Sequence, residues 1–195
     1  MNPFSFCPNS FLQLYNPNHI AHRRYLKKYN ISFSYCYCIF LDIDGVLYDW
    51  DYIIGEMNSG RMKKGSFINK FKPESMSALN YLIYKLSENY DVRIVISSTW
   101  RHNLPFAIKT LKENGLMYDK VIESTPISDP AKRGEQILEF LQDKQNYKMV
   151  IIDDEMFDFK KHFNMNNIIK TEMFHSALSL KDVRNFLNRE NEITK

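Results

Sequence analysis

Two aspartates one residue apart, at the end of an apolar run, are the residues with the clearest chemical potential in this chain. Asp42 and Asp44 follow the apolar residues 38–41, and Gly45 comes next. The run is typical of a buried strand, and ligands in open α/β sheets bind at the carboxyl ends of strands. Two carboxylates this close require a cation or a proton between them. Since Mg²⁺ prefers carboxylate oxygens, the sequence predicts a magnesium site here.

A calcium-binding loop is a weaker interpretation of the same aspartates. Such a loop needs glycine at its sixth position and glutamate at its twelfth. Counted from Asp42, these positions hold Leu47 and Ile53. The spacing excludes the calcium loop and leaves a turn with two solvated acids as the remaining alternative.

Polar side chains also follow two other predicted strands. Ser97 comes after the mainly apolar residues 92–96, and Asp153 and Asp154 come after residues 148–152. Because the carboxyl ends of parallel strands lie at one edge of a sheet, we expect these groups to lie near the first aspartate pair. A serine at a strand end or an acidic pair in a turn is common without a catalytic role. The prediction of a site therefore depends on these groups sharing one edge of the sheet.

A basic pair, Lys132 and Arg133, stands at the start of a predicted helix between the second and fourth strands. Together with the aspartates and Ser97, it completes the set that phosphoryl transfer requires. A carboxylate attacks phosphorus, Mg²⁺ neutralises part of the charge, a hydroxyl binds one phosphoryl oxygen, and a cation takes the remaining charge. The sequence leaves open which member of the pair is that cation.

Strands and helices alternate along the chain, which predicts an α/β fold with a parallel sheet. The first strand is expected to be central. Helices are predicted at residues 73–86, 103–114, 132–142 and 179–188, and further short strands at residues 118–122 and 167–169.

The motifs and their order resemble those of the haloacid dehalogenase (HAD) superfamily, which consists mostly of Mg²⁺-dependent phosphatases. The resemblance implies a three-layer Rossmann-like sheet with strand order 5-4-1-2-3 and a minimal cap or none. It also implies an aspartyl-phosphate intermediate, with Asp42 as nucleophile and Asp44 as general acid and base. Mg²⁺ is then expected to bind Asp42, the backbone of Asp44, Asp153 and Asp154.

Residues 97–101, 133–137 and 152–154 look like the HAD domains of "Swiss army knife" RNA-repair proteins. That similarity implies a phosphatase acting on the 3′ or 5′ phosphates of nucleic-acid ends. Ser98, Trp100 and Arg101 are then candidate substrate-binding residues, with Trp100 stacking on a base and Arg101 pairing with a phosphate. Core packing is the alternative for Trp100. Arg133 fits the spacing of this branch better than Lys132.

The first 34 residues form a predicted extension that is basic and contains no Asp or Glu. This composition fits either a mitochondrial targeting segment or a loosely ordered extension. The catalytic domain is predicted over residues 35–190, with a tail at residues 191–195. Three cysteines without a C-x-x-C pair indicate free thiols in a reducing compartment, so we expect a cytoplasmic protein, or a mitochondrial one if the extension is a targeting segment. The longest apolar run is too short to span a bilayer, so no membrane association is expected.

Residues 49–72 are predicted to be a long polar loop rather than a cap domain. The cations Arg61, Lys63 and Lys64 within it would form a flap that attracts a polyanion, unless the loop is simply a solvated surface. The open site favours large phosphate esters. A nucleotidase or small-metabolite phosphatase, a phosphoprotein phosphatase and a non-catalytic binding module with the same fold are the alternatives. The sequence does not indicate an oligomeric state.

Overall fold

The computed structural model describes residues 35–62, 70–174 and 176–193 of the 195-residue chain. The predicted N-terminal extension, Cys7, Lys63 and Lys64 lie outside the described residues. Among those that are described, no helix has the length and apolar character needed to cross a membrane.

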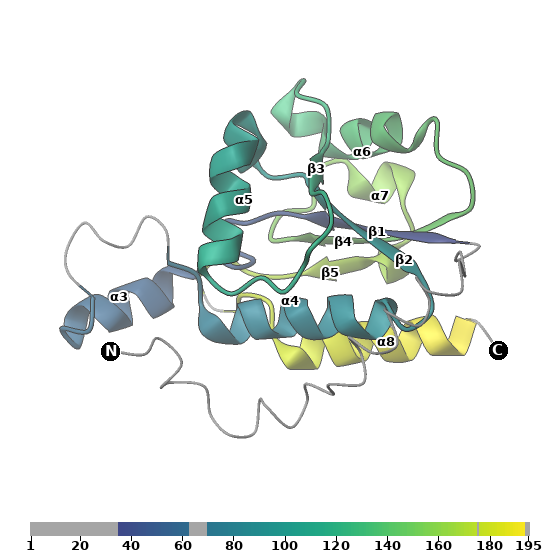
Figure 1. Ribbon diagram of the computed structural model, residues 1–195. Coiled ribbons are helices and arrows are strands. Elements are labelled where there is room, and N and C mark those ends of the chain that lie inside the picture. The colour runs from purple at the N-terminus through teal and green to yellow at the C-terminus, as the bar shows by residue number, and fades with distance from the viewer. Residues whose placement is uncertain (1–34, 63–69, 175, 194–195) are drawn as a thin grey trace. The chain divides into compact units, whose positions relative to one another are not determined.

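A single parallel sheet of five strands forms the centre of the domain (Figure 1). Its order is β3-β2-β1-β4-β5, which is the predicted order 5-4-1-2-3 viewed from the opposite edge. The α/β fold class and the central place of the first strand are therefore confirmed. The strands are β1 (Cys36–Leu41), β2 (Asp91–Ile96), β3 (Glu123–Ser124), β4 (Tyr147–Asp153) and β5 (Ile168–Lys170).

Strands β2 and β4 pair with β1 along its whole length, and both faces of β1 are buried in hydrophobic cores. Successive side chains of a strand point to opposite faces. Ile39 and Leu41 accordingly join one hydrophobic core, and Cys38 and Phe40 join the other. The Sγ atoms of Cys36 and Cys38 lie 3.8 Å apart, so these two thiols point to the same face of the sheet.

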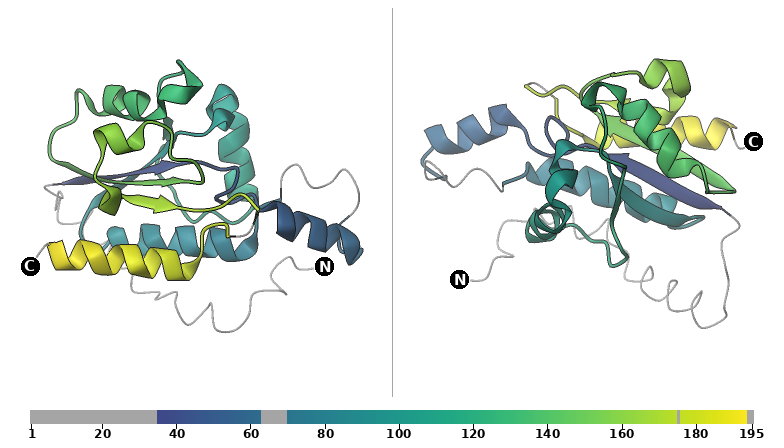
Figure 2. Two further views of the ribbon diagram at one scale, coloured as in Figure 1. Left: turned by 180° about the vertical axis from the view of Figure 1, so that it is seen from behind. Right: turned by 90° about the horizontal axis from the view of Figure 1, so that it is seen from above.

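Helices cover both faces of the sheet and make three layers (Figures 1 and 2). Helices α4 and α8 lie side by side on one face, and α5 contributes Ala107 and Leu111 to the same core. Helices α6 and α7 contact each other and supply Ile137, Leu141 and Phe159 to the core of the other face. The helices are α4 (Pro73–Leu86), α5 (Leu104–Glu113), α6 (Arg133–Leu141), α7 (Phe159–His162) and α8 (Leu180–Ile193).

The predicted starts of α4 and α8 agree with the structure. Pro73 occupies the first turn of α4, where its missing N–H is not needed. Ser179 and Asp182 form a capping box at the start of α8, since the Ser179 backbone N–H donates to Asp182 Oδ2 at 3.1 Å and the Asp182 N–H donates to Ser179 Oγ at 3.3 Å. Helix α8 continues to Ile193, so residues 191–193 belong to the helix rather than to the predicted tail.

The strand predicted at residues 118–122 is wrong. These residues are irregular, and the pairing with β2 is confined to Glu123 and Ser124. Val121 is exposed, and Tyr118 and Ile122 are buried for another reason: both side chains pack in the core, and the Tyr118 hydroxyl donates to the Val92 carbonyl at 3.1 Å. Burial without ladder pairing gave a strand-like pattern.

The loop predicted at residues 49–72 begins instead with a helix, α3 (Trp50–Asn58). Asp49 caps it by accepting a hydrogen bond from the Tyr52 N–H at 3.1 Å, and it also pairs with Lys72 at 2.5 Å. Trp50, Ile53 and Met57 lie at helical spacing, but only Ile53 is fully buried, while Trp50 and Met57 are partly buried against the core. Gly55 inside the helix and the polar residues that follow it gave the segment the composition of a loop. Arg61, expected in a basic flap, pairs with Glu56 at 2.6 Å.

The start of α6 is fixed by an aspartate from a distant part of the chain. The Asp158 carboxylate accepts hydrogen bonds from the backbone N–H groups of Gly134 at 2.6 Å and Glu135 at 3.2 Å. A Cβ atom at position 134 would lie 2.8 Å from Asp158 Oδ1, so glycine makes this approach possible. The cap satisfies two free N–H groups and complements the helix dipole. It thereby fixes Arg133, the first residue of the helix.

We expect Asp158→Ala to lower the free energy of unfolding by about 1–2 kcal/mol, because it removes a charged cap from a buried helix start. Urea denaturation monitored by circular dichroism measures the change. Asp129→Ala is the matched control. It removes a cap from the short 3₁₀ turn Pro130–Lys132 at an exposed site, and we expect a smaller loss. Equal losses would contradict a special role for Asp158.

Candidate active site

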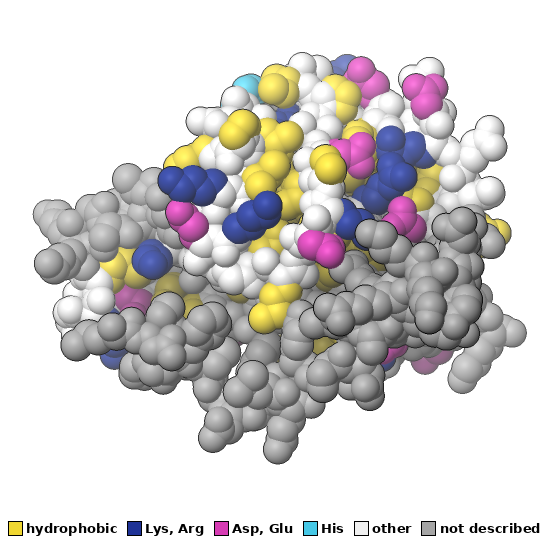
Figure 3. All heavy atoms as spheres, in the orientation of Figure 1, with side chains coloured by type: hydrophobic (Ala, Val, Ile, Leu, Met, Phe, Trp, Pro, Cys, Tyr) yellow, Lys and Arg dark blue, Asp and Glu magenta, His cyan; other side chains and the backbone are white. Residues whose placement is uncertain are grey.

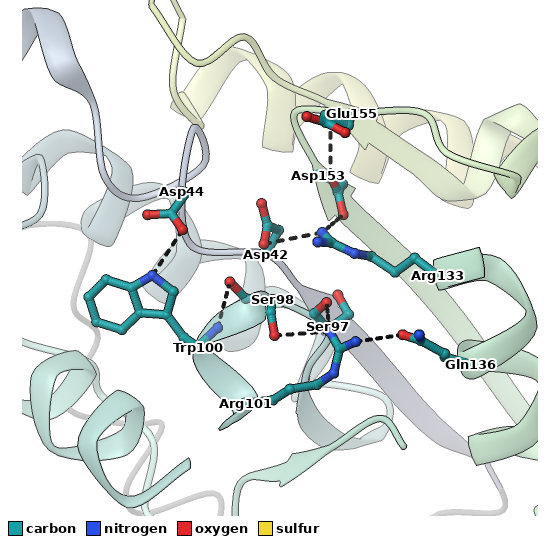
Figure 4. A network of polar contacts seen from close by, with 10 residues as sticks. All are labelled: Asp42, Asp44, Ser97, Ser98, Trp100, Arg101, Arg133, Gln136, Asp153 and Glu155. Carbon is teal, nitrogen blue, oxygen red and sulfur yellow. Dashed lines mark hydrogen bonds and ion pairs between the residues drawn. The ribbon is translucent and has the colours of Figure 1, made fainter. Parts of the chain in front are cut away.

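The carboxyl ends of β1, β2 and β4 bring the predicted site residues to one edge of the sheet (Figure 4). The sheet register continues just past the strands: the Asp42 N–H donates to the Ile152 carbonyl and the Ser97 N–H donates to the Leu41 carbonyl, both at 3.0 Å. Asp42 therefore lies between the polar segments that follow β2 and β4.

Arg133 lies between two buried carboxylates. Its Nη1 atom is 2.7 Å from Asp153 Oδ2 and 3.2 Å from Asp42 Oδ1. The Phe157 ring supports the other side of the guanidinium, with its centroid 4.2 Å from the Arg133 Cζ atom. Lys132, the other member of the basic pair, is exposed and pairs with Glu135 at 3.1 Å. Only Arg133 of the two contacts the aspartates.

Burial disfavours the ionised forms of Asp42 and Asp153. It raises the pKa of Asp42 to about 6, against the opposing effects of Arg133 and of a hydrogen bond with Ser98, while the nearby Asp154 raises it further. Burial and the charge of Asp42 raise the pKa of Asp153 to about 8, again opposed by Arg133. One arginine does not compensate the whole acidic group, so the site favours an additional cation or proton.

Three of the predicted metal ligands form a compact group. Asp42, Asp153 and Asp154 each offer a carboxylate oxygen, and these atoms lie within 4.8 Å of one another. Hard oxygen donors of this kind suit Mg²⁺. The carboxylate of Asp44 is absent from this group; it points toward Trp100 (Figure 4). A metal contact through the Asp44 backbone stays a prediction.

Gly45 makes room for Asp154 beside the metal-ligand group. Its φ of +70° lies in the left-handed region, which glycine adopts without a steric penalty. A Cβ atom at this position would lie 2.5 Å from the Asp154 carboxylate. The glycine is therefore required both by the turn and by the space that Asp154 fills.

The structure distinguishes the two serines after β2. The Ser98 hydroxyl forms a hydrogen bond with Asp42. Its oxygen also lies 3.4 Å from the backbone nitrogen of Trp100. The Ser97 hydroxyl is buried and has no hydrogen-bond partner among the described residues. Ser97 was the predicted phosphoryl-binding hydroxyl, and that role stays a prediction. Of the two serines, it is Ser98 whose hydroxyl contacts Asp42. From the sequence, Ser98 was only a candidate substrate-binding residue.

Arg101 lies behind the serines. Its Nη1 atom donates to the carbonyls of Ser97 at 2.6 Å and Ser98 at 3.0 Å, and its Nη2 atom donates to Gln136 Oε1 at 2.7 Å. The side chain is buried. In this arrangement Arg101 connects the segment after β2 to helix α6, and its contact with a phosphate stays a prediction.

Trp100 belongs to an aromatic row at the edge of the site. Its ring stacks on Phe106 with centroids 5.6 Å apart and packs against Phe71 at 5.8 Å. Its indole N–H donates to Asp44 Oδ2 at 3.0 Å. The packing expected as the alternative is therefore present, and base stacking on Trp100 stays a prediction.

Three residues with supporting roles were missed from the sequence: Gln136, Phe157 and Asp158. Gln136 binds Arg101, Phe157 covers Arg133, and Asp158 caps α6. Gln136 lies within residues 133–137, one of the segments that resemble the RNA-repair HAD domains, and this resemblance could have pointed to it. No sequence pattern pointed to Phe157 or Asp158, because their roles depend on the path of the chain after β4.

We expect Asp42→Asn to raise the melting temperature of the metal-free protein at pH 8 by a few degrees, since about 1 kcal/mol shifts a domain of this size by roughly 2–4 °C. The folded-state pKa values of Asp42 and Asp153 exceed the usual carboxyl value. The folded state therefore holds extra protons, and stability falls as pH rises from about 4 to about 8. Asp42→Asn removes one charge and leaves Arg133 paired with Asp153.

Thermal melts in excess chelator at pH 5 and pH 8 test this expectation. The gain should shrink at pH 5, where the carboxyl is largely protonated. Asp143→Asn, at an exposed position, is the matched control and should change little at either pH. A lower melting temperature for Asp42→Asn at pH 8 would contradict the account of the charge balance.

Comparison with known proteins agrees with this geometry. The family described as the HAD domain in Swiss Army Knife RNA repair proteins matches residues 38–183. This range covers most of the chain and includes both aspartate pairs, the one after β1 and the one at the end of β4. No curated protein and no solved structure matches the chain. The match supports a hydrolase of the phosphatase type, and the chain belongs to the family of HAD domains found in Swiss Army Knife RNA repair proteins.

Proposed function

We propose that this protein is a Mg²⁺-dependent phosphomonoesterase that forms an aspartyl-phosphate on Asp42. The observation that carries the proposal is the set of groups around this carboxylate. Arg133 approaches one oxygen at 3.2 Å, Ser98 forms a hydrogen bond with the side chain, and Asp154 lies close enough to influence its pKa. A nucleophile, a cation, a hydroxyl and a metal-ligand group converge at one strand end.

Asp42 is the proposed nucleophile. Its carboxylate attacks phosphorus while the bond to the leaving oxygen breaks, and Asp44 donates a proton to that oxygen. Asp44 then takes a proton from the water that hydrolyses the aspartyl-phosphate. Arg133 and the Ser98 hydroxyl bind phosphoryl oxygens, on which negative charge is spread in the transition state.

Asp42, Asp153 and Asp154 would hold the Mg²⁺ ion. The bound ion supplies positive charge against the phosphoryl oxygens and the carboxylates. The fit rests on the carboxylate donors within 4.8 Å of one another and on the raised pKa values of Asp42 and Asp153, which indicate an uncompensated acidic group.

Phosphorylated nucleic-acid ends are the proposed substrates. Family membership supports this class, and so does the form of the domain. In the described parts of the chain, the segment between β1 and α4 contains one helix, α3, and the segment between β2 and β3 contains the 3₁₀ helix Thr99–Asn103 and α5. Neither is a second domain that would enclose a small substrate. Small metabolites and phosphoproteins are the alternative substrates.

A panel of phosphomonoesters with 3′- and 5′-phosphorylated oligonucleotides, the matching mononucleotides and a phosphopeptide tests the proposal. We expect Mg²⁺-dependent release of phosphate, with a higher kcat/KM for an oligonucleotide end than for its mononucleotide. Asp42→Asn should abolish turnover, because an amide does not attack phosphorus. Chelator should remove the activity and Mg²⁺ should restore it.

Near-normal turnover in Asp42→Asn would contradict the covalent mechanism. Full activity in a metal-free preparation would contradict the role of the metal. A preference for a mononucleotide or the phosphopeptide would refute the proposed substrate class but leave the phosphatase mechanism in place. The melting temperature of each variant, measured with and without Mg²⁺, separates loss of catalysis from loss of folding.

Arg133 and Lys132 are neighbouring cations that differ in their surroundings, so they form a matched pair for a second prediction. Arg133→Lys should lower kcat/KM by about 10²–10³-fold, the usual loss for one buried donor to a developing oxyanion, because a compact ammonium does not reproduce the planar guanidinium whose Nη1 atom contacts both aspartates. Lys132→Ala should change kcat/KM by less than about threefold, since surface ion pairs contribute little. Steady-state kinetics on the best substrate measures both. The reverse ranking would assign the phosphate contact to Lys132.

A further inference from the structure

The indole N–H of Trp100 makes a hydrogen bond with Asp44 that general packing does not explain. Trp100 Nε1 lies 3.0 Å from Asp44 Oδ2 across 56 residues of sequence, and Figure 4 shows the ring edge directed at the carboxylate. Asp44 is half-buried, and the Trp100 N–H is the hydrogen-bond donor recorded for its side chain among the described residues. The contact joins the segment after β2 to the second aspartate after β1.

This contact has a direction because an indole N–H donates and never accepts. Asp44 Oδ2 must therefore act as the acceptor. When Asp44 carries a proton, that proton belongs on Oδ1, the oxygen that Trp100 does not occupy. The hydrogen bond thus fixes the rotation of the carboxyl group and selects the oxygen that holds the transferable proton.

The ring that provides this donor is itself held in place. Phe106 stacks on it with an interplanar angle of 21°, and Phe71 packs against it. The backbone N–H of Trp100 lies 3.4 Å from Ser98 Oγ. The same short segment therefore supplies the hydroxyl that contacts Asp42 and the N–H that contacts Asp44, which fixes the two aspartates relative to each other.

We infer that Trp100 is a positioning residue for the general acid: its indole N–H holds Asp44 so that the Oδ1 proton faces the leaving oxygen of the phosphate ester. This inference rests on the proposed function. In the step concerned, the bond from phosphorus to the leaving oxygen breaks, its electron pair stays on that oxygen, and the oxygen takes the proton from Asp44. Asp42 forms the new bond to phosphorus.

The dependence of the rate on the leaving group tests the inference. An alkyl phosphate, such as a sugar phosphate, has a basic leaving oxygen that needs the proton, whereas the nitrophenolate of p-nitrophenyl phosphate leaves without it. Trp100→Phe keeps an aromatic ring but removes the N–H. We expect its kcat on the alkyl ester to fall about tenfold or more, because a positioned general acid contributes about 10²–10⁴-fold. Its kcat on p-nitrophenyl phosphate should change by less than about threefold.

Asp44→Asn provides the reference pattern, with the same selective loss on the alkyl ester. The double variant Asp44→Asn/Trp100→Phe should be no slower on that ester than Asp44→Asn alone, because Trp100 acts through Asp44. Phe106→Leu is the matched control. It removes the stacking partner but keeps the N–H, so any effect should be equal for the two substrate types.

Equal losses of kcat on both ester types in Trp100→Phe would overturn the inference in favour of a general structural role. A rise in KM confined to oligonucleotides, with kcat unchanged, would overturn it in favour of base stacking. If Trp100→Phe does not fold, benzothienylalanine at position 100 replaces the N–H with sulfur in a ring of similar shape, and the same criteria apply. If the wild-type protein hydrolyses neither ester type nor any member of the phosphomonoester panel, the proposed function itself has failed.

Discussion

The contact of Arg133 with Asp42 and Asp153 is the interaction on which the rest of the site depends. Two buried carboxylates this close to a third, Asp154, would repel one another without a fixed positive charge. A buried charge is tolerated only when its partners and geometry are well defined. The protein meets this condition with supports around the guanidinium and the helix that carries it: the Phe157 ring contacts the guanidinium, and the Asp158 cap fixes the start of α6. Much of the structure at this end of the sheet serves to hold one guanidinium.

The residues between Ser97 and Arg101 connect this charged centre to the second aspartate. Ser98 contacts Asp42, Trp100 contacts Asp44, and Arg101 binds the carbonyls of the segment while reaching Gln136 on α6. Because α6 also carries Arg133, the segment after β2 and the helix form a continuous polar network around β1. A displacement of any one of these elements would change the positions of several groups at once.

The sequence predicted the features that depend on local pattern and strand order. The buried run before Asp42, the apolar stripe of α4 and the capping box at Ser179 each have a periodic or chemical signature, and parallel strands place Asp153 beside Asp42. Features that depend on the particular path of the chain were not accessible. Helix α3 has one fully buried side chain, Tyr118 and Ile122 are buried without strand pairing, and the placement of Ser98 rather than Ser97 against Asp42 depends on the path of the backbone after β2. Which of the basic pair enters the site likewise depends on an aspartate 25 residues beyond Arg133.

The absence of a Cβ atom at Gly45 determines part of the shape of the site. The Asp154 carboxyl group occupies the volume in which every other amino acid would place its Cβ atom. The turn after β1 and the turn after β4 therefore approach each other more closely than two ordinary side chains allow. The spacing of the acidic group is set by backbone-to-side-chain contact, which is stiffer than contact between two flexible side chains. A short motif of small and acidic residues can thus determine the separation of oxygen atoms on two different strands without any covalent link between them.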